Sequence, residues 1–211
     1  MSIPYESLKA LARQKRQEYK ISTDAFGLQR LRQIYKQERV VIDSWKLPPR
    51  IRAVYMCEDG DPSVLVNKAL PKEPRLFALV HELKHHYIDR LLIEGGKIKC
   101  GDYNANQEIE IGAEVFAAEF LYPEEEFLAC LSQLGIKQDG CTKKEDVVHL
   151  KRACGAPVSY TFLRKRLERM GFARPGAFDR VQFQKLEEEL FGVPIYKQEW
   201  FVQRRRRRSK T

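Results

Sequence analysis

Three of the four histidines in this chain of 211 residues lie in one short stretch, LVHELKHHYID, residues 79–89. His81 and His85 are four residues apart, so on a helix they lie about one turn apart on the same face and can bind one cation together. Glu82 follows His81 and lies about a quarter turn round the helix. This HExxH spacing is typical of sites where a metal ion polarises water and a carboxylate accepts the proton.

The surroundings of the motif decide between a site and a charged surface helix, because HExxH specifies only three residues and can occur by chance. The residues before His81 are apolar almost all round the helix, which indicates that this half is buried. Buried polar side chains without partners are costly, so histidines and a glutamate here predict a bound ligand. The apolar residues are Leu76, Phe77, Ala78, Leu79 and Val80.

A third ligand is expected downstream, because a catalytic zinc ion usually has three protein ligands and one open position. The segment QEIEIGAEVFAAEFLYP, residues 107–123, carries glutamates among small and apolar side chains. Glu110 and Glu114 share one helix face, and their spacing alone leaves either able to bind the ion. A solvated helix face is the alternative interpretation of these glutamates.

The sequence pattern around these residues predicts a mainly helical α+β fold with a small three-stranded sheet before the HExxH helix. Runs rich in β-branched and aromatic residues, separated by turn-forming residues, predict strands at about 39–45, 51–58 and 63–68. Periodicity predicts an HExxH helix over about 74–92 and a glutamate helix over about 106–121. Further helices are expected at 4–19, 22–37 and 124–131, followed by a helix-turn-helix pattern over 145–172.

Composition indicates a globular protein that does not enter a membrane. Hydrophobic residues make up 43% and charged residues 32% of the chain, and no run approaches the roughly 18 apolar residues that span a bilayer. The five cysteines are scattered without a CxxC pair, which fits reduced thiols. We therefore expect a cytoplasmic protein; a catalytic cysteine has no local signature here.

The basic charge of the chain is concentrated at its end. The formal net charge is +9, but the last nine residues hold six basic residues and no acidic one, which leaves a net charge of +3 for the rest. The run Arg204–Arg208 is typical of a solvated, disordered tail, with at most weak, salt-sensitive contact to nucleic acid.

Taken together, LFALVHELKHHYID and EIGAEVFAAEFLYP resemble the ImmA/IrrE family of metallo-endopeptidases, whose second motif is E-x-x-A-N-x-F-A-A-x-L-L-x-P. The resemblance covers about residues 5–172. It implies that Glu110 is the third ligand. Two positions depart from the family pattern: Lys84 replaces glycine and is expected to be exposed, and Glu114 replaces asparagine. We expect Glu114 to orient a ligand histidine from outside, with a ligand role as the alternative. The matching positions are Glu110, Ala113, Phe116–Ala118, Leu121 and Pro123.

The resemblance implies a zinc endopeptidase, with manganese possible in the cell, that cleaves a helix-turn-helix repressor in a stress response or in the induction of mobile elements. His81, His85 and Glu110 would hold the ion, and Glu82 would act as general base. We expect the substrate to add as a strand along Ser63–Asn67, contacting Val64, Val66 and Asn67. His86 is expected at the surface.

The predicted domains are a zincin-like peptidase at 1–140, a helical region at 141–202 and the basic tail at 203–211. A second class of function is a DNA-binding regulator with a structural or vestigial metal site. It rests on the helix-turn-helix pattern and the tail.

Overall fold

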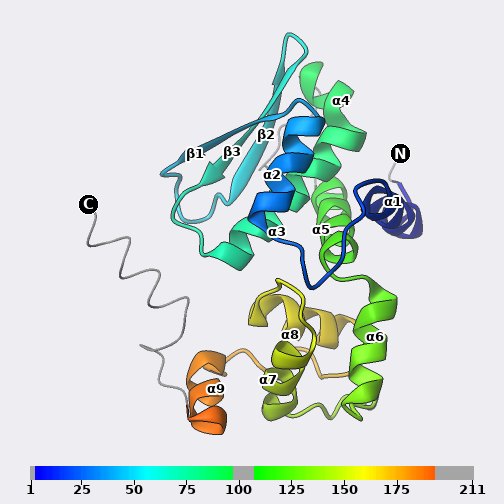
Figure 1. Cartoon of the computed structure of the whole chain (residues 1–211), viewed down its shortest axis with the longest axis vertical. Coiled ribbons are helices and arrows are strands. Elements are labelled where there is room, and N and C mark those ends of the chain that lie inside the picture. Colours follow the sequence, from blue (N-terminus) through cyan, green and yellow to red (C-terminus); the bar gives the residue numbers. More distant parts are fainter. Residues whose placement is uncertain (1–2, 97–106, 193–211) are drawn as a thin grey trace. The chain divides into compact units, whose positions relative to one another are not determined.

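The computed structural model describes residues 3–96 and 107–192, so the tail and its arginine run lie outside the described residues. As predicted, the fold is mainly helical with one small three-stranded sheet (Figure 1). Contacts divide the chain into two compact units, Met1–Phe127 with Gly155–Ser159, and Leu128–Cys154 with Tyr160–Thr211. A peptidase domain ending at residue 140 stays a prediction.

The first unit contains the sheet and both helices that carry the motifs. The predicted strands and helices are present, but the helix predicted at 22–37 begins only at Leu28, and the HExxH helix is interrupted by a π-helical turn at His85–Asp89. In chain order the elements are α1 (Tyr5–Glu18), α2 (Leu28–Gln37), β1 (Val41–Trp45), β2 (Ala53–Glu58), β3 (Asp61–Asn67), α3 (Lys72–Lys84), the π-helix η1 (His85–Asp89), α4 (Arg90–Glu94) and α5 (Gln107–Leu121).

The sheet has the strand order β1-β3-β2, so β3 is its central strand. β3 pairs with β2 in an antiparallel hairpin and with β1 in parallel. The hairpin turn consists of Asp59 and Gly60, both at positive φ (49° and 82°), which a two-residue turn of this kind requires.

The central position of β3 corrects the predicted substrate strand. Both edges of β3 are occupied by neighbouring strands, and Val64, Val66 and Asn67 are buried, so no peptide can add along Ser63–Asn67. The Asn67 side chain donates to the carbonyls of Leu47 (3.1 Å) and Ile51 (3.0 Å) and therefore holds the loop before β2.

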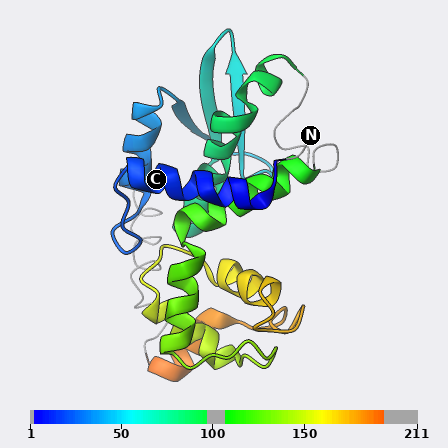
Figure 2. The same ribbon diagram turned by 90° about the vertical axis from the view of Figure 1, so that its right-hand side faces the viewer.

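α3 packs between the sheet and α5, and α1 packs on α5 (Figures 1 and 2). Apolar residues at helical spacing on these elements form the core, which fixes the two motif-bearing helices side by side. Fully buried core residues include Leu31, Ile34, Tyr35, Leu76, Val80, Leu83, Ala113, Phe116, Ala117 and Phe120.

In the second unit the predicted helix-turn-helix region forms α7 (Lys144–Ala153) and α8 (Tyr160–Arg169). α6 (Glu124–Gln133) spans the division between the units, and α9 (Phe183–Phe191) follows α8. The rings of Tyr160 and Phe183 stack with centroids 4.9 Å apart, which attaches α9 to this unit. Across the described residues, no helix combines the length and apolar character needed to cross a membrane.

Candidate metal centre

Three side chains from two helices meet where the end of α3 and the start of η1 pack beside α5. The Nε2 atom of His81 lies 3.0 Å from Glu110 Oε2 and 3.3 Å from His85 Nε2. His85 Nε2 lies 3.8 Å from Glu110 Oε1. The structure therefore brings together the three residues that the sequence analysis named as ligands, and leaves their nitrogen and oxygen atoms within 4.8 Å of one another.

These separations suit one tetrahedral ion. Zinc binds imidazole nitrogen and carboxylate oxygen at about 2.0–2.2 Å, so neighbouring ligand atoms around it are about 3.3–3.5 Å apart. The observed separations of 3.0, 3.3 and 3.8 Å lie on both sides of this value. Two imidazoles and one carboxylate are also a donor set that zinc prefers, so the residues fit the ion.

Glu82 adds a carboxylate with an incomplete set of partners. Only 4% of the residue is exposed, and the backbone N–H of Tyr55 on β2 donates to its carboxylate. Its Oε2 atom has no hydrogen-bond partner within the described part of the chain. Burial raises the pKa of Glu82, while the charges of His81 and His85 act to lower it. A buried carboxylate oxygen left unpaired is costly, which indicates that a ligand or water completes this site.

The cluster is open on the His81 side. The His81 side chain is 15% exposed, whereas that of His85 is 1% exposed. Burial acts to lower the pKa of His81, but the hydrogen bond with Glu110 and the charges of Glu82, Glu110 and Glu114 outweigh it and raise that pKa. The site thus attracts positive charge and offers access beside His81.

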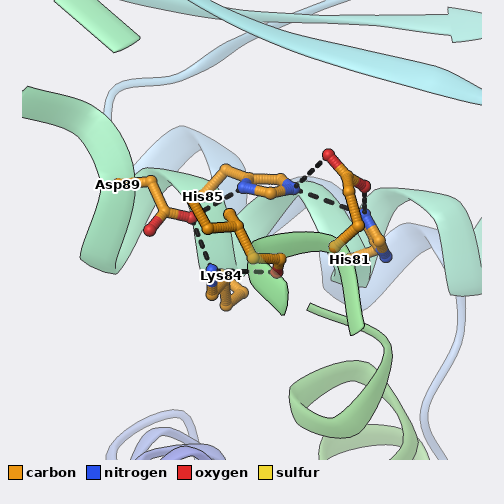
Figure 3. A network of polar contacts seen from close by, with 6 residues as sticks. His81, Lys84, His85 and Asp89 are labelled. Atoms are coloured by element: carbon orange, nitrogen blue, oxygen red, sulfur yellow. Dashed lines mark hydrogen bonds and ion pairs between the residues drawn. The ribbon is translucent and has the colours of Figure 1, made fainter. Parts of the chain in front are cut away.

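Asp89, which the sequence analysis did not identify, holds the outer nitrogen of His85. Asp89 Oδ2 lies 2.7 Å from His85 Nδ1, and Figure 3 shows this contact on the side of the imidazole away from His81. Such a carboxylate fixes the tautomer and the orientation of a ligand histidine. Its spacing of four residues after His85 was the available signal.

Glu114 does not make the contact that was predicted for it. It is half-buried, and it forms no hydrogen bond with His81 or His85. Its charge acts on His81 only at a distance. The π-helical turn η1 brings Asp89 against His85 instead.

Two residues expected at the surface are buried. Lys84 is 3% exposed because its ammonium finds two acceptors inside the protein, Asp89 Oδ2 at 2.6 Å and the carbonyl of Ile109 at 3.1 Å. His86 is 8% exposed, and its Nδ1 lies 3.1 Å from the hydroxyl of Tyr55.

Two histidines one turn apart on one helix, facing a glutamate on the next, form the arrangement of metallopeptidase-like proteins. Residues 51–168 match the IrrE N-terminal-like domain, a peptidase family. The chain belongs to this family.

Comparison with solved structures finds the same fold in a Mycobacterium tuberculosis transcriptional regulator, with a TM-score of 0.52 and 22% sequence identity. The match covers 77% of this chain and 47% of that protein, so this chain spans about half the length of its structural relative. A search of curated proteins returns no significant match.

Proposed function

We propose that this chain is a zinc-dependent endopeptidase that cleaves a helix-turn-helix transcriptional repressor and so relieves repression. The observation that carries the peptidase assignment is the meeting of His81, His85 and Glu110 beside the incompletely paired carboxylate of Glu82. The family supports the same chemistry.

In this proposal each of the four site residues has one task. His81, His85 and Glu110 would hold the ion, which would supply a water with a pKa lowered to about 7 and would polarise the substrate carbonyl. Glu82 would accept a proton from the attacking water and deliver it to the leaving amine.

The repressor substrate is supported by the resemblance of both motifs to the ImmA/IrrE family and by the structural relative, which is itself described as a transcriptional regulator. Cleavage of a regulator would connect the peptidase to gene expression, as in a stress response or in the induction of a mobile element.

The test is to incubate the purified chain with each helix-turn-helix repressor of its own genome, one at a time, and to follow cleavage by mass spectrometry. We expect one repressor to be cut at a defined bond. A chelator should stop the cut, zinc should restore it, and Glu82→Gln should slow it by about 10²–10⁴-fold. β-Casein serves as an unrelated substrate: cleavage of casein but of no repressor would retain the peptidase and refute the substrate. Metal-independent cleavage of either would refute the mechanism.

A further inference from the structure

The buried ammonium of Lys84 contacts the supports of two proposed ligands at once. Lys84 Nζ donates to Asp89 Oδ2 at 2.6 Å, and this same oxygen lies 2.7 Å from His85 Nδ1. Lys84 Nζ also donates to the carbonyl of Ile109 at 3.1 Å. Ile109 directly precedes Glu110 on α5. Lys84 therefore connects the helix that carries the histidines with the helix that carries the glutamate.

The neighbouring helix leaves space for this connection. A Cβ atom at Gly112 would lie 3.7 Å from Lys84 Cε and 3.0 Å from Leu8 Cδ1. The 3.7 Å to Lys84 Cε is ordinary van der Waals contact, so the Lys84 stem packs directly against α5 at this position. Only the side chain of Leu8 comes closer than a Cβ atom at residue 112 would normally allow.

Lys84 and Asp89 form an ion pair of their own, with Nζ and Oδ2 2.6 Å apart. The positive charge of Lys84 is thus offset by the negative charge of Asp89, so the pair adds no net charge to the centre. Because a buried pair of this kind is not needed to neutralise the centre, its geometry is the more informative feature.

We propose that Lys84 is a positioning residue, which holds His85 and Glu110 at the separation that one metal ion requires. The inference rests on the proposed function, because it assigns Lys84 a role toward the same ion. Groups outside the ligand shell typically change metal affinity by about 10–100-fold when they are removed. Lys84 acts on two ligands, so its removal should fall in this range.

The experiment titrates the full chain, stripped of metal by a chelator, with Co²⁺ and follows the visible absorption spectrum. A competing chelator of known affinity gives the dissociation constant. We expect Lys84→Met to bind Co²⁺ about 10–100-fold more weakly than the wild type, with an altered spectrum because the ligand geometry changes.

Arg16 provides a matched control. Its guanidinium is buried and donates to the carbonyl of Phe120 at 2.6 Å, so it too ties a cation to the backbone of α5. Phe120 lies ten residues after Glu110, about 15 Å along the helix axis. Arg16→Met should lower the thermal stability of the protein and leave its cobalt affinity and spectrum unchanged.

A second pair of variants separates positioning from charge and remains informative if Lys84→Met does not fold. In Asp89→Asn the ammonium of Lys84 no longer has a carboxylate partner. If Lys84 matters only through charge, adding Lys84→Met to Asp89→Asn removes a repulsive cation and cobalt binding stays equal or tightens. If Lys84 holds α5 through Ile109, the double variant binds cobalt more weakly than Asp89→Asn alone.

The outcomes distinguish this inference from the proposed function. Weaker cobalt binding in both lysine variants, with normal binding in Arg16→Met, supports the positioning role. Unchanged affinity in Lys84→Met, or a double variant that binds cobalt as tightly as Asp89→Asn or more tightly, overturns the positioning role alone. A wild-type protein that binds no cobalt overturns the proposed metal site and this inference with it.

Discussion

Buried charged groups lie at both ends of α5, and the two ends differ in how completely these groups are paired. At the C-terminal end, Arg16 donates to the Phe120 carbonyl (2.6 Å) and to Thr23 Oγ1 (2.7 Å), and its second nitrogen lies 3.3 Å from Glu126. Glu119 accepts from Arg13 at 2.9 Å and from the backbone N–H of Glu124 at 3.1 Å.

At the N-terminal end, two imidazole nitrogens face each other at 3.3 Å beside Glu110, and Glu82 Oε2 lacks a partner among the described residues. Buried polar groups in proteins normally have hydrogen-bond partners. The completely paired groups at one end of α5 therefore stabilise the fold, while the incompletely paired groups at the other end indicate a ligand-binding site. Substitutions at the two ends should change different properties.

The largest effect is expected from Glu110→Ala, which removes one of the three proposed ligands. Loss of a direct ligand should exceed the ~10–100-fold effect of outer groups, so the purified variant should contain little metal by elemental analysis and show no cleavage. Glu114→Ala is the matched control on the same helix and should keep one ion per chain. Stoichiometric zinc in Glu110→Ala would transfer the third ligand to another residue.

Glu82→Gln should separate chemistry from binding. Loss of a general base costs about 10²–10⁴-fold in rate, while all three proposed ligands remain, so metal content should stay at one ion per chain. Burial raises the pKa of Glu82, which means that ionising it near pH 7 costs folding free energy. Without metal, Glu82→Gln should then unfold at a urea concentration equal to or higher than that of the metal-free wild type. A variant that cleaves at the normal rate would remove Glu82 from the mechanism.

Arg16→Met should change stability alone. The substitution leaves the carbonyl of Phe120 without its buried donor, which costs about 1–3 kcal/mol in free energy of unfolding. Urea denaturation of the metal-loaded protein measures this loss, and elemental analysis should still find one ion per chain. Loss of metal from folded Arg16→Met would show that the two ends of α5 are coupled.

Lys9→Met should have the smallest effect. Lys9 pairs with Glu6 and Glu124, both at 2.9 Å, but its side chain is 22% exposed. Partly exposed ion pairs contribute about 0.2–1 kcal/mol, so urea denaturation should detect a small loss that decreases further at high salt. A loss of stability comparable with that of Arg16→Met would mean that solvent exposure does not determine how much each of these two cations contributes to stability.

The parts of the site that follow from helical spacing were predictable from the sequence. His81 and His85 converge because residues four apart share a face, and the second motif correctly selected Glu110 to lie beside them. The strands were predicted within a few residues because β-branched runs and turn residues such as Asp59 and Gly60 are local signals.

The parts that depend on distant contacts were not predictable. The order of strands along the chain does not reveal that β3 is central. β3 pairs in parallel with β1, although β2 lies between these two strands in the sequence. A lysine at a variable position of the HExxH motif is normally expected to reach solvent. Lys84 stays inside because Asp89 and the carbonyl of Ile109, from a later helix, accept its hydrogens.

The π-helical turn η1 supplies both the proposed ligand His85 and the carboxylate of Asp89 that contacts it. Residues His85–Asp89 form a single wide turn, a geometry that is rare in proteins and frequent at functional sites. Asp89 reaches His85 from this turn, so an occupied centre and a closed turn favour each other, and this linkage is reciprocal. Slower exchange of these amide protons should accompany occupancy, and a partner that opens the turn would displace His85 together with Asp89 and so release the ion.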